Sequence, residues 1–288
     1  MIPSAFDYYA PSSVAEAIQL LQEHGDEAKL LGGGHSLLPA MKLRLTSVGK
    51  LIDITKIEEL KGISASGDRL VVGAGTTYHS IATSQDVLNS CAVLAECVSQ
   101  IGDIQVRNRG TLGGCIAHAD PAADMPAVVL ALDASITAQG PNGERSISAS
   151  DLFVSMLATS LEPDEVLTSV SFPKLGAGEG AAYTKMRQPA SRYAIVGVAA
   201  YVKLENGKVS AARVGVTGAG TIAVRQPEVE QALIGTDGSD AAIAAAAEKA
   251  GQDVDYLGDI HASNEYREAM VKVYTKRALS EAIKRARS

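Results

Sequence analysis

Two short glycine-rich segments carry the residue types from which a phosphate-binding site is built. Residues 32–36, which we call the first glycine loop, read Gly-Gly-Gly-His-Ser. Three successive glycines let backbone N–H groups approach a pyrophosphate, because no Cβ stands in the way. The hydroxyl of Ser36 adds one more donor. The first glycine loop is therefore a candidate site for the phosphates of a nucleotide cofactor.

Residues 111–115, the second glycine loop, read Thr-Leu-Gly-Gly-Cys and offer the same elements, a hydroxyl and a pair of glycines. Two such loops that face each other would hold one diphosphate from both sides. Glycines are also common in ordinary turns, so spacing alone leaves a purely structural role open. The stretch 73–78 is interpreted as a strand-to-helix turn and 215–220 as the end of a hairpin strand, and the sequence contains no P-loop motif.

Two carboxylates follow the second glycine loop. Asp120 precedes Pro121, a pair typical of the N-cap and the first position of a helix. Asp124 lies one turn further on, where a carboxylate favours the positive end of the helix dipole. A carboxylate at that place also accepts hydrogen bonds from two hydroxyl groups of a sugar. The sequence leaves both roles of Asp124 open.

We expect no metal site. His35 and His118 have no Cys, His or Asp partners at ligand spacing. Cys91, Cys97 and Cys115 are too few and wrongly spaced for a disulfide framework, and no Cys-x-x-Cys occurs. This cysteine usage favours a reducing cytoplasm.

The composition describes a globular protein of about two domains. The chain has 288 residues, of which 46% are hydrophobic and 20% charged, and its net charge is -7. An acidic balance argues against sequence-independent binding of nucleic acid, which needs a basic surface. The richest apolar stretch, 193–202, is half as long as a bilayer span, so we expect no transmembrane segment. The first residues show no secretion signal, which again predicts a cytoplasmic protein.

Regular elements are expected on both sides of the glycine loops. Ser13 and Glu16 form a capping box at the start of a helix that ends at Gly25. A strand at 28–31 leads straight into the first glycine loop. The other predicted elements are a strand at 50–54, hairpins at 63–73 and 194–216, helical segments at 90–101 and 121–132, strands at 135–139 and 165–172, and a helix at 265–285.

Strands and helices follow one another in blocks rather than in strict alternation, which indicates an α+β fold. The run Gly-Ala-Gly-Glu-Gly at 176–180 breaks the chain and predicts a domain boundary. We therefore expect one domain at 1–176 and a smaller α+β domain at 177–288, with a short antiparallel sheet and helices.

Several of these segments also resemble a known family. Residues 32–39, GGGHSLLP, are similar to the first flavin motif of the medium subunit of CO dehydrogenase-type molybdenum hydroxylases, in the xanthine dehydrogenase superfamily. Residues 105–114, QVRNRGTLGG, resemble the second motif, and 117–127, AHADPAADMPA, continue its pattern. The opening Phe-Asp-Tyr at 6–8 and the Tyr-Arg pair at 266–267 also fit, so the likeness covers nearly the whole chain.

The resemblance implies a two-part FAD-binding domain of the vanillyl-alcohol-oxidase (PCMH) type, followed by a C-terminal domain like that of the CO dehydrogenase flavoprotein. It implies that both glycine loops hold the pyrophosphate of FAD. Asp124 then matches the position that binds ribityl or ribose hydroxyls, and Ile101 the position against the adenine. Leu167 and Lys185 match contacts near the flavin ring, and Tyr193 matches a tyrosine over the isoalloxazine, where it would cover or gate the flavin face.

The expected cofactor-binding residues are therefore Gly32, Gly33, Gly34, His35, Ser36, Leu37, Ile101, Thr111, Gly113, Gly114, Cys115, Asp124, Leu167, Lys185 and Tyr193. One of them departs from the family, which usually has Asn or Ser where this chain has Cys115. A thiol is a weak hydrogen-bond donor, so a contact through this side chain would be weakened, whereas a contact through its backbone would not.

The resemblance also implies that other subunits act on the substrate. It predicts an FAD-carrying subunit of a heterotrimer that takes electrons from a partner's [2Fe-2S] clusters and passes them to an external acceptor. The two clusters lie on a small partner and the molybdenum cofactor on a large partner, and the expected assembly is a dimer of heterotrimers. A [2Fe-2S] cluster needs four thiolates, and this chain has three scattered cysteines. The alternatives are a stand-alone FAD-dependent oxidase of the same fold and a nucleotide-binding scaffold subunit without redox function.

Overall fold

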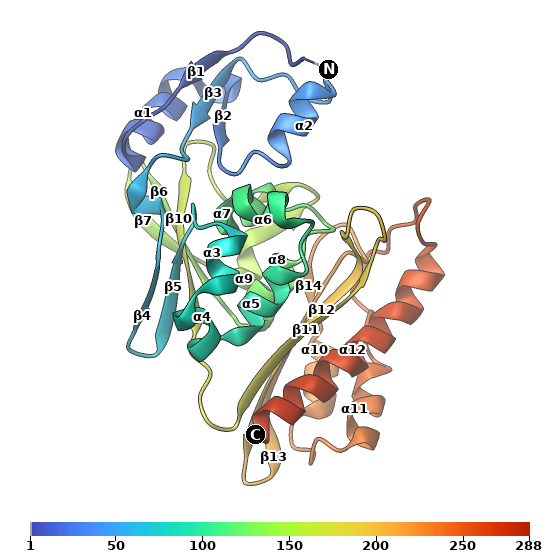
Figure 1. Cartoon of the computed structure of the whole chain (residues 1–288). Helices are drawn as coiled ribbons and strands as arrows, with labels where there is room; N and C mark the ends of the chain where they lie inside the picture. Colours follow the sequence, from blue (N-terminus) through green and yellow to red (C-terminus); the bar gives the residue numbers. More distant parts are fainter. Residues whose placement is uncertain (1) are drawn as a thin grey trace.

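In the computed structural model, which describes residues 2–288, a small N-terminal lobe lies above two larger sheets that enclose a block of short helices (Figure 1). The strands are β1 (Asp7–Tyr9), β2 (Ala28–Leu31), β3 (Lys50–Asp53), β4 (Ile63–Ser66), β5 (Arg69–Gly73), β6 (Ser135–Gly140), β7 (Gly143–Ser148), β8 (Phe153–Ser155), β9 (Ala158–Thr159), β10 (Val166–Pro173), β11 (Glu179–Arg187), β12 (Ala194–Glu205), β13 (Lys208–Thr217) and β14 (Val224–Arg225).

The helices are short except for the first and the last. They are α1 (Val14–His24), α2 (Leu37–Lys42), α3 (Tyr78–Thr83), α4 (Gln85–Ser90), α5 (Ala92–Ser99), α6 (Ile104–Arg109), α7 (Leu112–His118), α8 (Met125–Ala131), α9 (Ala149–Leu152), α10 (Pro227–Leu233), α11 (Asp240–Ala247) and α12 (Asn264–Ala286), with 3-10 turns at Gly25–Glu27 and Glu58–Leu60.

The N-terminal lobe is a parallel three-stranded sheet in the order β1-β3-β2, with α1 and α2 beside it. Its apolar core includes Val14 and Ile18 from α1 and Ile52 from β3. The Ser13 hydroxyl accepts from the N–H of Glu16, as the capping box predicts. The Glu16 carboxylate, however, accepts from Ser12 rather than from Ser13, so the reciprocal half of the box is shifted by one residue.

The two larger sheets are antiparallel. One has the order β4-β5-β10-β6-β7 and the other β11-β12-β13-β14. Helices α7 and α4 pack on the first of these sheets, and α5 and α8 pack on the second. One apolar cluster joins the two: it includes Val98 from α5 and Phe172 from β10, together with Tyr183 and Ala199 from β11 and β12. The chain is thus α+β, as the sequence predicts.

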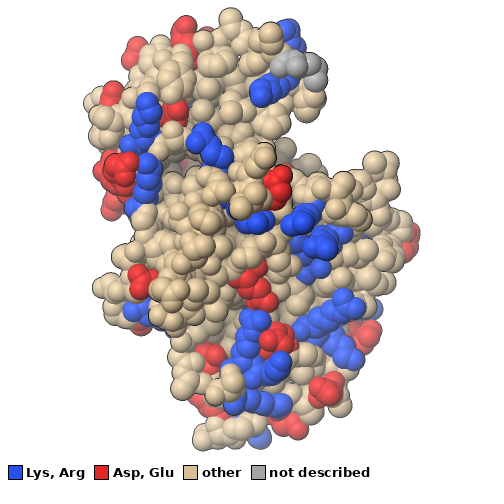
Figure 2. All heavy atoms as spheres, viewed as in Figure 1, with Lys and Arg blue, Asp and Glu red and all other residues tan. Residues whose placement is uncertain are grey.

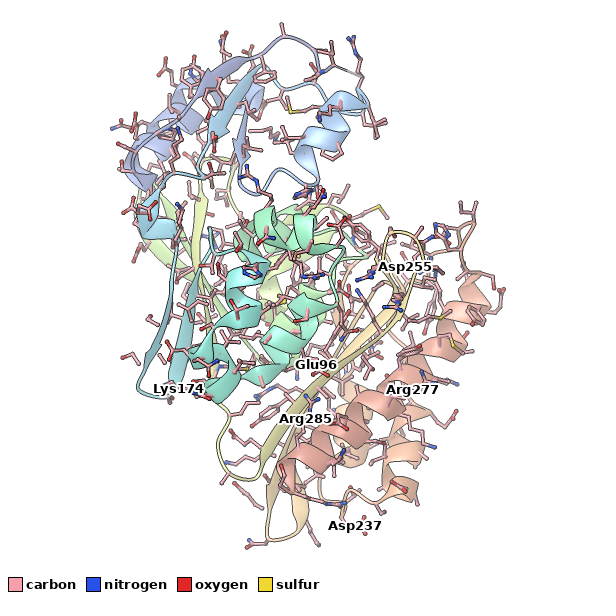
Figure 3. All side chains as sticks on the ribbon, viewed as in Figure 1. Glu96, Lys174, Asp237, Asp255, Arg277 and Arg285 are labelled. Atoms are coloured by element: carbon pink, nitrogen blue, oxygen red, sulfur yellow. The ribbon has the colours of Figure 1, made fainter. Side chains whose placement is uncertain are left out.

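Helix α12 covers the outer face of β11 and β12. At Gly180 the helix comes so close that an added Cβ would overlap the carbonyl oxygen of Ala282. Arg285, near the end of α12, donates to both carboxylate oxygens of Glu96 on α5, at 2.8 and 3.1 Å (Figure 3). This ion pair ties α12 to the helices that lie across the sheet.

Most predicted elements are confirmed, including both hairpins and the long final helix. The stretch 215–220 ends a strand, as predicted: β13 runs through Gly215 to Thr217, and Gly218 breaks it at φ 80°. The helix predicted at 121–132 begins only at Met125. The carbonyls of Pro121 and Ala123 accept from the Thr217 hydroxyl instead, so contacts with the C-terminal sheet replace the first helical turn.

Candidate functional site

A cleft of about 960 Å³ lies between the N-terminal lobe and the rest of the molecule. In Figure 2 the surface is notched beneath the lobe that carries α2. Of the fifteen residues predicted to bind a cofactor, fourteen line this cleft: Gly32, Gly33, Gly34, His35, Ser36, Leu37, Ile101, Thr111, Gly113, Gly114, Cys115, Asp124, Leu167 and Tyr193. The exception is Lys185, which lies behind Asp124.

The first glycine loop joins the end of β2 to the start of α2. Gly34 has a φ of 74°, a left-handed backbone that glycine adopts without strain. Within residues 2–288, the N–H groups of Gly33, Gly34, His35 and Ser36 donate to no protein acceptor. Four neighbouring donors without protein partners form a site for an anion.

The two glycine loops meet at Gly33. An added Cβ there would overlap the carbonyl oxygen of Arg109 and lie 2.7 Å from the Cα of Gly110, just before the second glycine loop. The glycine is therefore needed for the contact between the loops as well as for access to the N–H groups. The sequence argument gave only the second of these reasons.

The second glycine loop does not present the same donors as the first. Thr111 is the N-cap of α7, and its hydroxyl accepts from the N–H of Gly114 at 3.1 Å. The N–H of Gly113 donates to the carbonyl of Ala74 at 2.8 Å. Both glycine N–H groups are thus already bonded within the protein. The second loop thus has the predicted hydroxyl and glycine pair, but it uses these donors within the protein and to start a helix.

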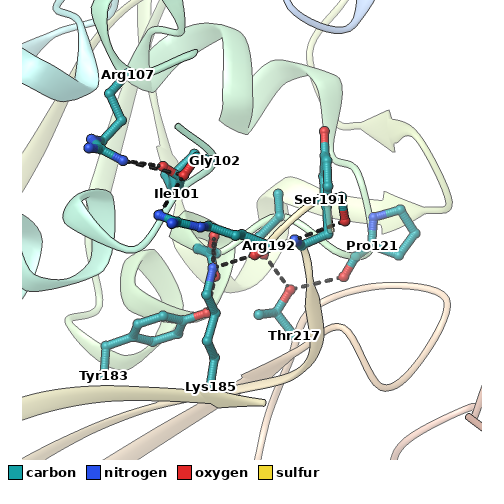
Figure 4. A network of polar contacts seen from close by, with 12 residues as sticks. Ile101, Gly102, Arg107, Pro121, Tyr183, Lys185, Ser191, Arg192 and Thr217 are labelled. Atoms are coloured by element: carbon teal, nitrogen blue, oxygen red, sulfur yellow. Dashed lines mark hydrogen bonds and ion pairs between the residues drawn. The ribbon is translucent and has the colours of Figure 1, made fainter. Parts of the chain in front are cut away.

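Asp124 is the buried acidic residue in the wall of the cleft. It has 4% of its surface exposed and accepts hydrogen bonds from the Tyr183 hydroxyl and from Lys185 Nζ at 2.9 Å (Figure 4). Burial raises the pKa of Asp124, and the Lys185 charge and the Tyr183 hydroxyl oppose that rise. Asp124 occupies the N-cap position of α8 but makes no capping hydrogen bond with its side chain.

Residues 188–193, which join β11 to β12, bring Tyr193 to the cleft. The Arg192 guanidinium donates to the carbonyl of Gly102 at 3.1 Å, and Lys185 donates to the carbonyl of Arg192 at 2.7 Å (Figure 4). Tyr193 is 44% exposed. The C-terminal half of the chain therefore completes a wall of the cleft.

The sequence argument did not find Tyr183 or Tyr78. Tyr183 and Lys185 are two residues apart on β11, so they lie on one face of the strand and reach Asp124 together. A lysine two positions after a tyrosine in the same strand was the available signal. Tyr78 is buried in the cleft wall and begins α3, at the end of the 73–78 stretch that was interpreted as a strand-to-helix turn.

Cys115 has a thiol that stays protonated in the folded chain. Burial raises its pKa to about 12 from an ordinary value of 9.0. Above the lower of these values the unfolded thiol ionises and the folded one does not, so its stabilising contribution is lost as pH rises.

We expect the free energy of unfolding to fall with pH more steeply in the unsubstituted protein than in Cys115→Ala. The difference should be about 1.4 kcal/mol per pH unit between about pH 9 and 11. Denaturant unfolding at several pH values measures it. Equal slopes for the two proteins would contradict the burial of this thiol.

The residues of the cleft fit FAD. A pyrophosphate requires convergent donors, which the first glycine loop supplies, and a sugar requires an acceptor, which Asp124 supplies. Cofactor sites are commonly clefts of about 300–1,000 Å³, and this cleft is at the upper end of that range. In the described residues no three His, Cys, Asp or Glu side chains are placed to hold a metal ion.

Comparison with known proteins agrees with this assignment. Residues 4–175 match the family model "FAD binding domain in molybdopterin dehydrogenase", and residues 181–282 match "CO dehydrogenase flavoprotein C-terminal domain". The chain is 40% identical, over 100% of its length and 97% of the relative's, to the 6-hydroxypseudooxynicotine dehydrogenase complex subunit alpha of Paenarthrobacter nicotinovorans. It is 39% identical to the carbon monoxide dehydrogenase medium chain of Hydrogenophaga pseudoflava, over 98% of both chains.

Solved structures agree as well. A chain of carbon monoxide dehydrogenase from Hydrogenophaga pseudoflava superposes with a TM-score of 0.97 at 41% identity, over 99% of both chains. A chain of quinoline 2-oxidoreductase from Pseudomonas putida 86 superposes with a TM-score of 0.93 at 33% identity, over 100% of both chains.

Fold and cleft thus define an FAD-binding component of a dehydrogenase. The chain belongs to the family of FAD-binding medium subunits of CO dehydrogenase-type molybdenum hydroxylases, and it is an oxidoreductase subunit. No helix within residues 2–288 is both long enough and apolar enough to cross a membrane.

Proposed function

We propose that this chain is the FAD-carrying electron-transfer subunit of a heterotrimeric molybdenum hydroxylase, with FAD bound in the cleft beneath the N-terminal lobe. The observation that carries the proposal is the first glycine loop, whose four N–H groups without protein acceptors line a cleft of about 960 Å³. When bound, FAD supplies the ability to accept and release electrons.

The protein residues bind and orient the cofactor in this proposal. The first glycine loop binds the pyrophosphate, and Thr111 and its neighbours form the opposite wall. Asp124 accepts hydrogen bonds from ribityl or ribose hydroxyls. Burial raises the pKa of its carboxyl, but the paired Lys185 charge favours the ionised form, which accepts these bonds. Ile101 packs against the adenine, and Leu167 lines the flavin end.

The electrons come from partner subunits in this proposal. A small subunit carries two [2Fe-2S] clusters, a large subunit carries the molybdenum cofactor, and two heterotrimers form a dimer. Two observations support partner clusters: the chain has three cysteines, and a cluster needs four thiolates. The names of the relatives, medium chain and complex subunit, describe parts of assemblies. The proposal includes a cytoplasmic location, which three free thiols support.

The proposal divides the chain into an FAD-binding domain at 1–176 and a C-terminal domain at 177–288. The separate matches of the two family models, at 4–175 and 181–282, support this division. The apolar cluster that joins both parts supports a fixed arrangement between them.

The test is a visible spectrum of the purified chain, first alone and then after co-expression with the subunits encoded beside it. We expect flavin absorbance, release of FAD by heat, and co-purification of an iron–sulfur and a molybdenum protein. A chain that stays colourless with added FAD in both preparations would overturn the proposal. If FAD binds but no partner subunit co-purifies with the co-expressed chain, the result would instead favour a stand-alone oxidase.

Tyr193 is proposed to cover the flavin face. We expect Tyr193→Ala to increase quenching of flavin fluorescence by iodide, because removing the ring opens the cleft to solvent. Tyr193→Phe should behave like the unsubstituted protein, because it keeps the ring. Unchanged quenching and unchanged dye-reduction rates in both variants would remove this role.

A further inference from the structure

Lys185 is buried but does not line the cleft. Its side chain is 1% exposed, and its ammonium group contacts both carboxylate oxygens of Asp124 and the carbonyl oxygen of Arg192 at 2.7 Å. An ammonium group has three N–H donors. Two of these contacts are hydrogen bonds, one to Asp124 and one to the Arg192 carbonyl, and Lys185 is not among the residues that line the cleft.

We propose that Lys185 is a positioning residue that holds two walls of the cofactor cleft at once: the Asp124 carboxylate and, through the Arg192 carbonyl, the segment that presents Tyr193 (Figure 4). This proposal rests on the proposed function only where it concerns FAD. The resemblance implied that Lys185 lies near the flavin ring; the geometry assigns it an indirect role.

The Asp124 wall depends on charge. A carboxylate that is 4% exposed is strongly disfavoured unless it is paired, and removing the partner of a buried ion pair leaves an uncompensated charge. The Tyr183 hydroxyl donates to Asp124 but carries no charge. Without Lys185 the carboxyl therefore takes up a proton at a higher pH and becomes a poorer acceptor for sugar hydroxyls.

The Arg192 carbonyl is one of the groups that hold the wall formed by Tyr193. Arg192 has a φ of 62°, in the left-handed region that a residue with a Cβ adopts at a cost. Its N–H donates to the carbonyl of Gln188, its guanidinium donates to Gly102, and its carbonyl accepts from Lys185. These contacts hold residues 188–193 in the shape that brings Tyr193 to the cleft.

Four thiol and phenol groups near Asp124 remain neutral around pH 7. Burial raises the pKa of Cys115 on α7 to about 12, and raises the pKa values of Cys97 on α5, Tyr78 on α3 and Tyr183 on β11 well above their ordinary values. Further groups that interact with this cluster or line the same cleft are Glu96, Asp120, Tyr193, His35 and His118. Because several ionisable groups surround Asp124, the test needs a variant that cannot ionise at Asp124.

The first experiment measures FAD affinity from about pH 6 to 9, in the full chain or in the assembled complex. Lys185→Met should bind FAD about tenfold more weakly at neutral pH, and its affinity should rise with pH as Asp124 ionises. The double variant Lys185→Met with Asp124→Asn should lose that pH dependence, because it cannot ionise at position 124. An unchanged affinity and pH profile in Lys185→Met would overturn the Asp124 part.

The second experiment needs no cofactor. Trypsin cuts after arginine, so cleavage between Arg192 and Tyr193 reports on how firmly residues 188–193 are held. Cleavage there should be about tenfold faster in Lys185→Met than in Asp124→Asn, which keeps the bond from Lys185 to Arg192. Equal rates would overturn the Tyr193 part. If Lys185→Met does not fold, the double variant Lys185→Met with Asp124→Asn replaces it in this comparison, because it buries no unpaired charge. Recovered folding of the double variant would itself support the pairing of Lys185 with Asp124.

The two proposals fail in different ways. If the unsubstituted protein takes up no FAD, alone or assembled, the proposed function fails, and trypsin cleavage still reports on Lys185. If the unsubstituted protein binds FAD and the Lys185 variants match it in both experiments, only the positioning role is wrong.

Discussion

Gly33→Ala should abolish FAD binding, whereas Gly32→Ala should leave most of it. A Cβ at Gly33 overlaps the Arg109 carbonyl and crowds Gly110, and backbone atoms of two joined loops cannot move aside as a side chain can. A Cβ at Gly32 meets only the Thr111 hydroxyl, at 3.3 Å. The two loops should therefore separate only in Gly33→Ala, which displaces the N–H groups from the pyrophosphate.

The measurement is the FAD content of each purified variant, together with its melting temperature. We expect a loss of affinity of at least about 100-fold for Gly33→Ala, which corresponds to the loss of two or more charge-assisted hydrogen bonds. The loss should exceed any effect on unfolding, because the strain is local to the two loops. Equal FAD content in the two alanine variants would show that the contact between the loops does not shape the site.

Arg267→Met should produce the largest loss of stability among substitutions on α12. The Arg267 guanidinium is 4% exposed and donates to the carbonyls of Ile195 and Gly218, at 2.6 and 2.7 Å, and to Asp259 at 2.7 Å. Methionine fills similar space but leaves two buried carbonyls without donors, each at a cost of about 1–3 kcal/mol. A loss of about 3 kcal/mol corresponds to a fall of about 6–12 °C in melting temperature for a chain of this size.

Arg277→Met is the matched control on the same helix. Arg277 is exposed and lies 4.7 Å from the ring centre of Tyr274, a contact worth about 0.5–1 kcal/mol at the surface (Figure 3). Thermal unfolding of the two variants should therefore differ by several degrees. Similar melting temperatures would mean that Arg267 does not fasten β12 and the Asp259 loop to α12.

Local patterns were sufficient to predict most of the fold. The Ser13 cap, the alternation along the 63–73 hairpin and the break at Gly25 each act within a few residues, so neighbouring sequence decides them. The late start of α8 could not be predicted from the local sequence. The Thr217 hydroxyl, nearly a hundred positions away, donates to two carbonyls of the first expected turn. Contacts of that kind follow from packing rather than from local preference.

The residues of the site, like the elements of the fold, were predicted only in part. Fourteen of its predicted residues line one cleft, and glycine composition with family resemblance was enough to select them. The pairing of Asp124 with Tyr183 and Lys185 was not predictable, because it depends on how β11 lies against α8. The different donors of the two glycine loops also depend on a distant group, the Ala74 carbonyl.

The cover that α12 provides for β12 has a consequence during synthesis on the ribosome. Nine consecutive residues of β12, from Ala194 to Val202, are buried, and α12 begins about 60 residues later in the chain. Because the ribosome adds about 5–20 residues per second, several seconds pass between the synthesis of β12 and the synthesis of α12. During that interval the nascent chain exposes the apolar residues of β12. Molecular chaperones that bind extended apolar segments should therefore associate with it until translation passes α12.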